Sequence, residues 1–484
     1  MDVSHGQLPF KLIVSARGEP EVTAHAGVPL VVEVALAVID KRQYRALRDA
    51  LGYTSYRVVR RHVLSLVTLI ATGGECIDDL ETLRADQGLA LLLGFELSSP
   101  TQMKEFLYRF HQREDGEALT AEEDERLSAA GQAQIRPEGP GLRALAQMVR
   151  AVVEAVQRRA QQPRATLDVD ATLIEAAKRE ALRTYEGPRG YQPQMAWWAE
   201  QSVWVCDEFR DGNVPAAFAV KEFLQKAFAA LPATVKERRL RGDSALYDEK
   251  ALTWADESGI QFAVSADMSR ELLHAVMATP EELWKPYRTL RESEGARDEE
   301  ERQWAEVEFV PDWARNRKKK GTPLRYIAIR VRSRQADLLL PASMQWRHFG
   351  VVTNMDWDGE RLLRWQREKQ GTVEHGHLVV KDELAGGTLP CGRFGANAAW
   401  WRINALVQNL LQLLKAASLP SEMSALRPKA LRFRLFNVGG RLVRHGRQLF
   451  LRLSEKLPIA TTYAKARESI LALCTSPPGA PTAA

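Results

Sequence analysis

The segment Thr166–Ile174 constrains the fold more than any other part of the chain. In the string Leu167-Asp-Val-Asp-Ala-Thr172, apolar residues alternate with polar ones. Because successive side chains of a strand point to opposite faces, this alternation predicts a strand with one apolar and one polar face. Asp168 and Asp170 then share the polar face. Such a strand requires a fold in which apolar packing on one side accompanies a polar site on the other.

The segments after this strand predict a mixed α/β sheet. Short apolar runs alternate there with amphipathic stretches. The expected strands are 195–198, 203–209, 238–240, 261–265 and 349–353, and the expected helices are 217–231, 247–257, 358–384 and 396–416. Strands that alternate with helices are typical of a sheet covered by helices.

Changes in composition suggest further boundaries. With 484 residues and 45% apolar content, the chain has material for about three domains. We expect an N-terminal, mainly helical region at 1–114, an acidic linker at 115–141, an α/β core at 142–266 and 347–418, a β-rich insertion at 267–346 and a basic, helical C-terminal region at 419–484. We see no internal repeat.

Basic residues are concentrated near the C-terminal end. The net charge is only +5, but 427–452 contains eight Lys or Arg and no Asp or Glu. If Arg441–Arg452 is helical, Arg441 and Arg444 lie on a face opposite Leu442, and such a helix suits phosphates or an anionic membrane surface. A solvated surface is the alternative. The acidic residues described below favour DNA as the partner.

Several classes of protein are excluded. Four scattered cysteines do not form a disulfide framework or a Cys-x-x-Cys metal site. The sequence contains no uncharged apolar run of the ~18 residues that a membrane span needs, and no signal pattern. We therefore expect a cytoplasmic, nucleoid-associated protein with no membrane partner. No phosphate-binding glycine motif occurs, so ATP dependence is not expected.

Three carboxylates stand out by their positions. Asp170 lies on the polar face of the first strand, Asp243 follows an apolar strand, and Glu374 lies in the long helix. Carboxylates at strand ends and on a packed helix can converge, and the cluster then repels itself unless cations neutralise it. Oxygen ligands of this kind suit Mg²⁺ or Mn²⁺. Two such ions can clamp the attacking and leaving oxygens of a phosphoryl transfer.

The chain resembles the DDE transposases of bacterial insertion sequences. The branch is the one with a Tyr-x2-Arg-x3-Glu-x6-Lys signature and a β-rich insertion in its catalytic domain. The resemblance is carried by the strings Thr23-Ala-His-Ala-Gly27, Ile70-Ala-Thr-Gly-Gly74, Leu83-Arg-Ala-Asp86, Leu167-Asp-Val-Asp-Ala-Thr172, Arg241-Gly-Asp-Ser244, Gly371-Thr-Val-Glu374 and Gly392-Arg-Phe-Gly-Ala-Asn-Ala-Ala-Trp400. The last string is the most specific.

The resemblance implies an RNase H-like core in which Asp170, Asp243 and Glu374 are catalytic and bind two Mg²⁺ or Mn²⁺ ions. Asp170 is preferred as the first ligand because it opens an Asp-x-Thr step, and Asp168 is the alternative. The signature lysine matches Lys381. On one continuous α-helix, its seven-residue spacing from Glu374 would point both side chains the same way.

Two signature positions differ from the family. Arg367 stands where the signature has Tyr, and Gln370 stands where it has Arg. Either a neighbouring basic residue such as Lys369 makes the DNA contact, or this branch relaxes the signature. The DNA contacts expected from the sequence are Lys381, Arg367, Gln370, Arg441, Arg444 and Arg447, with Arg57, Arg60 and Arg61 as candidates in the N-terminal region.

Other residues have competing interpretations. His375 and His377 flank Glu374, but no partner has zinc spacing, so packing or DNA contact is favoured. Ser244 fits a helix cap better than a nucleophile. The resemblance also suggests that a tryptophan of the insertion stacks on an extruded base, and a structural role is the alternative. The candidates are Trp304, Trp313 and Trp346.

The expected function is that of an insertion-sequence transposase acting on double-stranded DNA. The resemblance implies that a homodimer pairs two terminal inverted repeats, cuts their 3′ ends and joins them to target DNA, with donor release through a hairpin intermediate. Two alternatives remain open. One is an RNase H-like nuclease without strand transfer, and the other is an inactive DNA-binding relic of a transposase.

Overall fold

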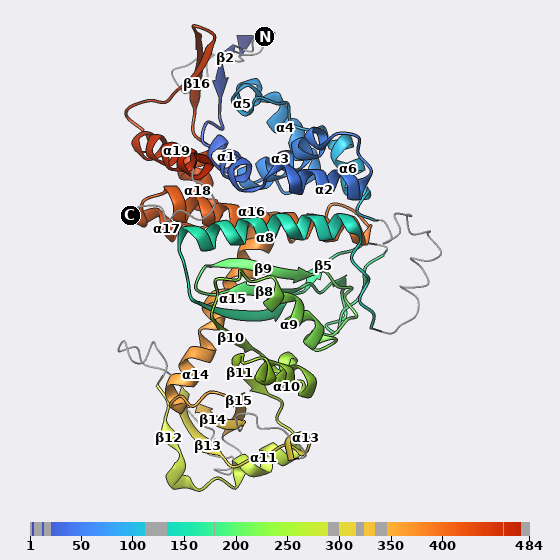
Figure 1. Ribbon diagram of the computed structural model, residues 1–484, viewed down its shortest axis with the longest axis vertical. Coiled ribbons are helices and arrows are strands. Elements are labelled where there is room, and N and C mark those ends of the chain that lie inside the picture. Colours follow the sequence, from blue (N-terminus) through green and yellow to red (C-terminus); the bar gives the residue numbers. More distant parts are fainter. Residues whose placement is uncertain are drawn as a thin grey trace. The chain divides into compact units, whose positions relative to one another are not determined.

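The computed structural model describes residues 2–3, 12–13, 21–111, 133–178, 180–288, 300–315, 324–333, 346–457 and 459–475 (Figure 1). Its chain forms two compact units. Unit 1 consists of Met1–Leu119, Pro137–Arg159 and Val379–Ala484, and unit 2 of Thr120–Arg136 and Ala160–Leu378. Most of the predicted linker at 115–141 lies outside the described residues.

Unit 1 is mainly helical in its described part. Its principal helices are α1 (Pro29–Val38), α2 (Lys41–Leu51), α3 (Tyr56–Thr72), α4 (Leu80–Ala85), α5 (Gln87–Leu93), α6 (Pro100–Tyr108), α8 (Pro140–Arg159), α16 (Phe394–Ser418) and α19 (Ala460–Thr475). Asp40 begins α2 with a capping box, and Ser55 caps α3. α16 is buried along most of its length and packs beside α8, so it forms the centre of this unit (Figure 1).

Part of the basic C-terminal region forms a β-hairpin, so the prediction of a helix at Arg441–Arg452 was wrong. β16 (Gly440–His445) pairs antiparallel with β17 (Gln448–Arg452) and with β3 (Val22–Thr23). Gly446 and Arg447 join them with φ of 55° and 64°. Two successive left-handed residues make the turn that best fits a two-residue hairpin, and a glycine disfavours the helix interior.

Unit 2 contains a nine-stranded mixed sheet, which confirms the predicted mixed α/β architecture. Its strands are β4 (Arg164–Ala171), β8 (Gln194–Trp198), β9 (Val203–Glu208), β10 (Glu237–Gly242), β11 (Gln261–Ala266), β12 (Lys285–Pro286), β13 (Glu300–Val307), β14 (Arg325–Ser333) and β15 (Arg347–Thr353). They lie in the order β12-β13-β14-β15-β11-β10-β4-β8-β9. β4, β10 and β11 are parallel, and the other neighbours are antiparallel.

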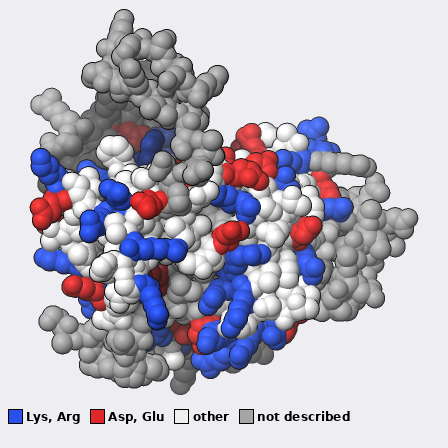
Figure 2. Space-filling view, turned by 90° about the horizontal axis from the view of Figure 1, so that it is seen from above, with Lys and Arg blue, Asp and Glu red and all other residues white. Residues whose placement is uncertain are grey.

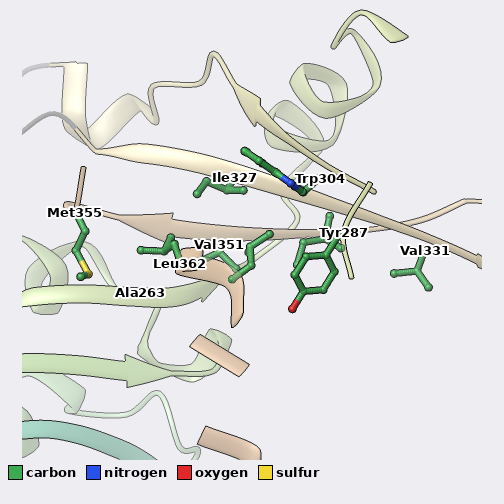
Figure 3. Packing of buried hydrophobic residues seen from close by; sticks show 10 residues of the cluster. Ala263, Tyr287, Trp304, Ile327, Val331, Val351, Met355 and Leu362 are labelled. Carbon is green, nitrogen blue, oxygen red and sulfur yellow. The ribbon is translucent and has the colours of Figure 1, made fainter. Parts of the chain in front are cut away.

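The β-rich segments of 267–346 extend this sheet rather than standing apart from it. β13 and β14 pair through β15 with β11. Trp304 of β13 lies in an apolar cluster with Ile327 and Val351 (Figure 3). A Cβ at Gly359 would come within 2.1 Å of the Trp304 ring, so glycine permits this packing. Trp304 is 5% exposed, which fits the structural role that was the alternative to base stacking.

The helix expected at 358–384 is divided. α14 (Gly359–Arg367) and α15 (Lys369–Leu378) are separated at Glu368, and Val379–Glu383 is a π-helix. A π-helix turns by less than 100° per residue, so the α-helical projection of Lys381 onto the face of Glu374 does not hold. In the parts of the chain that are described, we find no helix whose length and apolarity would suffice for a membrane span.

Candidate active site

Two of the three predicted carboxylates lie at the carboxyl ends of neighbouring parallel strands, Asp170 near the end of β4 and Asp243 directly after β10. Val169 of β4 is in register with Gly242 of β10. The next residues along the two strands are Asp170 and Asp243, so both carboxylates lie at the same edge of the sheet. Asp170 Oδ1 accepts a hydrogen bond from the amide of Ala171 at 3.0 Å. Asp243 caps the following turn, because its Oδ1 accepts from the amide of Ala245 at 3.0 Å.

α15 brings the third carboxylate to the same place. Glu374 lines a cavity of about 450 Å³ together with Asp170 and Asp243, and we call it the carboxylate cavity. Burial raises the pKa of Asp170 to about 6, the positive charge of Lys369 opposes this rise, and the negative charges of Asp243 and Glu374 add to it. Three carboxylates from elements far apart in the sequence are thus close enough to interact electrostatically.

Basic and polar residues from the junction of α14 and α15 line the other part of the cavity. They are Gln366, Arg367, Lys369 and Gln370. Lys369 is buried, although it carries a charge. The Arg367 Nε is buried and has no hydrogen-bond partner among the described residues. An arginine N–H that lines a cavity in this state can donate to an anion there.

One wall of the carboxylate cavity is apolar. It is formed by Ala266, Met268, Ile329, Phe349 and Val351. Phe349 of β15 is 44% exposed, which is unusual for a large aromatic side chain next to charged groups. The cavity therefore presents charge on one side and a hydrophobic surface on the other.

Asp168 has a different role from Asp170. It is fully buried and receives two hydrogen bonds from Arg241, Nε to Oδ1 at 2.6 Å and Nη2 to Oδ2 at 2.9 Å. Burial alone would lower the pKa of Arg241, but these bonds and one to Glu368 raise it, so the guanidinium stays charged. Asp168 does not line the carboxylate cavity.

The buried pair of Asp168 and Arg241 holds α14 and α15 against the sheet. Arg241 Nη1 donates to the Trp365 carbonyl at 2.6 Å and to Glu368 Oε2 at 2.9 Å. The Thr372 hydroxyl donates to Asp168. Gln366 Nε2 donates to the Gly242 carbonyl at 3.2 Å. The end of α14 and the first turn of α15 are therefore tied to β4 and β10, which positions Glu374 near the two aspartates.

A family model described as transposase DDE domain group 1 matches residues 10–475. The chain belongs to this family. The family implies an enzyme of DNA transposition, and DDE transposases generally use divalent metal ions. No curated protein matches this chain. Among solved structures, a cryo-EM structure of the piggyBac transposase synaptic complex with hairpin DNA covers 84% of this chain and 78% of its own, with 11% identity and a TM-score of 0.46.

Several predicted site residues of this DDE-family chain belong to unit 1 or have another role. Lys381 belongs to unit 1 and does not line the carboxylate cavity. Arg441, Arg444 and Arg447 lie on the β16–β17 hairpin, also in unit 1. His377 is buried in unit 2, and its ring lies 5.0 Å from that of Trp204, which is the packing role expected. Ser244 lines the cavity, and the cap expected from it comes from Asp243 instead.

Sequence reasoning did not single out two residues near the carboxylates of this DDE-family site. Phe349 lay in an expected strand, and nothing in its pattern distinguished it from core. Tyr185 is 76% exposed on the turn between β6 (Leu182–Arg183) and β7 (Arg189–Tyr191). A hydrogen bond with Glu186 raises the pKa of Tyr185, and the charges of Asp170 and Asp243 add to the rise. No motif signals a residue that reaches the site from a separate hairpin.

Proposed function

We propose that this chain is an insertion-sequence transposase in which Asp170, Asp243 and Glu374 are the catalytic and metal-binding residues. The observation that carries the proposal is that these three carboxylates line one cavity, where the negative charges of Asp243 and Glu374 add to the rise in the pKa of Asp170 that burial causes. Membership of the DDE family supports the reaction class. The finer steps are part of the proposal: binding of terminal inverted repeats, pairing of two ends by a homodimer, and cut-and-paste strand transfer.

An RNase H-like core is also part of the proposal. The strands β9-β8-β4-β10-β11 are consecutive in the sheet, with β8 antiparallel to β4, and with β10 and β11 parallel to it. This arrangement supports the proposed fold because it sets the first two carboxylates at one sheet edge, where a helix can supply the third.

The donor set fits hard divalent cations. Carboxylate oxygens are the ligands that Mg²⁺ and Mn²⁺ prefer, and a cavity where three carboxylates repel one another gains from a cation. Among the described residues, no three His, Cys, Asp or Glu side chains are already arranged as a ligand set. We propose two ions, which when bound would polarise the phosphate and activate the attacking oxygen. Asp170, Asp243 and Glu374 would hold them.

The remaining cavity residues act on the DNA in this proposal. Lys369 partly offsets the carboxylate charge and keeps Asp170 ionisable near neutral pH. Arg367 and Gln370 donate to phosphate oxygens beside the bond that is cut, because both line the cavity and Arg367 Nε is otherwise unsatisfied. The apolar wall at Phe349 accommodates the adjoining sugar and base.

A plasmid cleavage assay tests the proposal. The substrate is a supercoiled plasmid that carries the DNA flanking this gene, with Mg²⁺, Mn²⁺ or EDTA. We expect cleavage only with metal, and a loss of at least about 10³-fold in Asp243→Asn and Glu374→Gln, because residues that act as a unit fail together. Asp267→Asn is the matched control, since Asp267 is exposed and follows the neighbouring strand β11 but does not line the cavity.

The outcomes separate the alternatives. Metal-dependent cuts at the repeat ends followed by joined products support the transposase. Cuts without joining support a nuclease and contradict strand transfer. Binding without cleavage by the unaltered chain contradicts the enzyme and leaves a DNA-binding relic. Equal loss in Asp267→Asn would contradict the specific role of the three carboxylates.

A further inference from the structure

The exposed face of α3 carries three arginines at helical spacing. Arg57, Arg60 and Arg61 occupy positions i, i+3 and i+4, which lie on one face of a helix. They line a hollow of about 330 Å³ in unit 1. The opposite face of α3 is buried in the core of that unit. The arginine face is therefore set by the same amphipathic pattern that packs the helix.

A second hollow adjoins the first. It has about 710 Å³ and is lined by α4 and α5 and by the β16–β17 hairpin, which contribute Arg84 and Arg444. Gly94 and Phe95 line both hollows, so the two share a border. We call the five residues Arg57, Arg60, Arg61, Arg84 and Arg444 the arginine surface. One acidic residue, Glu96, also lines the second hollow.

These five arginines form no ion pair within the described parts of the chain. Other arginines of the same unit are neutralised, as Arg42 is by Asp40, Arg48 by Asp49 and Arg467 by Glu33. The Arg61 Nε is buried and has no hydrogen-bond partner among the described residues. A buried, unsatisfied guanidinium N–H beside a hollow points to an acceptor that is supplied from outside.

The hairpin that supplies Arg444 is firmly attached to α5. The amide of Ala24, the hydroxyl of Thr23 and Nδ1 of His25 all contact Asp86 Oδ2, at 3.2, 2.7 and 2.9 Å. Asp86 also caps α5 through the amide of Leu89. At Gly88, a Cβ would come within 2.3 Å of the Val22 carbonyl. The strand beside the hairpin thus packs directly on α5, and Arg444 is held beside Arg84.

We propose that the arginine surface binds the phosphate backbone of duplex DNA, outside the carboxylate cavity. This proposal rests on the proposed function, which makes DNA the substrate. The contacts are to phosphates rather than to bases. The guanidinium groups are spread over two helices and a hairpin, and such an arrangement suits the regularly spaced phosphates of DNA. Duplex DNA carries one negative charge per about 1.7 Å of its axis, which a single small anion cannot match.

Figure 2 is consistent with a charged face of this kind. It shows Lys and Arg side chains gathered in contiguous groups on the face in view, with Asp and Glu interspersed. The five residues of the arginine surface form no ion pair among the described residues, whereas Arg42, Arg48 and Arg467 do. An anionic partner therefore gains their whole charge without first breaking an ion pair.

Fluorescence anisotropy with a labelled 30-bp duplex in EDTA tests the proposal. The full chain is compared with the triple variant Arg57→Gln, Arg60→Gln, Arg61→Gln. The matched control is Arg42→Gln, Arg48→Gln, Arg467→Gln, which removes the same charge from the same unit at ion-paired sites. We expect binding to weaken by about 10- to 100-fold in the first variant and the salt dependence to become shallower by about two to three phosphate contacts.

The control should change affinity by less than about 3-fold. Equal weakening in both triple variants would overturn the proposal, because net charge alone would then explain binding. Unchanged binding in the first variant would also overturn it, and so would equal competition by polyglutamate of matched charge. Thermal unfolding of both variants checks that they fold. Since EDTA prevents cleavage, failure here leaves the carboxylate proposal untouched, and Arg84→Gln with Arg444→Gln extends the test to the second hollow.

Discussion

The carboxylate cavity of unit 2 and the arginine surface of unit 1 both gather like charges, but with opposite signs and in different surroundings. Asp170 and Asp243 are half-buried, Glu374 is exposed, and burial raises the pKa of Asp170 to about 6. The arginines are half-buried or exposed, and a guanidinium does not lose its proton in proteins. A proton or a cation can therefore reduce the repulsion among the carboxylates. Only an anion can reduce the repulsion among the arginines. The charge of the carboxylate cavity should therefore depend on pH, and anion binding by the arginine surface should depend on ionic strength.

Ion pairs elsewhere in the chain have a structural role, in contrast to these unpaired like charges. Asp168 lies two residues from Asp170 on the same strand, yet it is neutralised by Arg241 at 2.6 Å. Arg136 with Asp211 and Arg402 with Glu138 are similar buried pairs. Where opposite charges meet, they position elements. Where like charges meet without partners, they are available for a ligand.

Asp168→Ala should have the largest effect on stability. It leaves Arg241 2% exposed without its main partner, and breaking a buried pair costs about 3–5 kcal/mol. Urea unfolding measures the loss. Arg164→Gln on the same strand is the control, because its pair with Glu237 is about half exposed and contributes less than about 1 kcal/mol. Equal losses of unfolding free energy in the two variants would contradict the expectation that a buried ion pair contributes more to stability than an exposed one.

Asp170→Asn should stabilise the metal-free protein. A carboxyl whose folded pKa of about 6 exceeds the ordinary 3.8 contributes stability below pH 3.8 that is lost as pH rises through 6. At pH 8 in EDTA, the Asn variant should therefore be more stable by at most about 3 kcal/mol, and by about half of that at pH 5. Thermal unfolding at both pH values tests this. A variant that is less stable than the unaltered protein at pH 8 would show that burial and the neighbouring carboxylates do not destabilise the ionised form of Asp170.

Arg447→Gly should have the smallest effect, a gain of about 1 kcal/mol. Arg447 has a φ of 64°, a conformation that glycine adopts without strain. Arg441→Gly is the control, because Arg441 is in an extended strand where glycine lowers stability. If duplex affinity falls by several-fold while stability rises, the strained turn has been kept for DNA contact. Unchanged affinity would limit the DNA-binding residues to the arginine surface.

The strand that carries Asp170 was more predictable than the basic C-terminal region. The alternation at Thr166–Ile174 predicted a strand, since a period of two separates a strand from a helix over that length, and β4 occupies Arg164–Ala171. The hairpin at Gly440–Arg452 was missed because its basic and apolar residues also fit a short amphipathic helix. Only the turn at Gly446-Arg447 distinguishes the two, and it depends on Arg447 adopting an uncommon backbone conformation.

The remaining differences between prediction and structure arise from tertiary contacts. Trp304 and Phe349 are both aromatic residues on strands, but one is buried against Gly359 and the other is exposed in the cavity. A single sequence contains no signal for which face of a long sheet meets a helix. Lys369 was considered only as a substitute DNA contact, because its electrostatic effect on Asp170 depends on how α15 crosses β4.

The chain order of unit 1 has a consequence for biosynthesis. Its central helix α16 begins at Phe394, whereas unit 2 ends at Leu378. A ribosome therefore completes the carboxylate cavity before it has made the helix around which unit 1 packs, and Arg444 follows later still. Since domains generally fold as units during synthesis, the carboxylate cavity can form before unit 1 packs and before Arg444 completes the arginine surface. Translation that stops before α16 yields a chain whose arginine surface is incomplete.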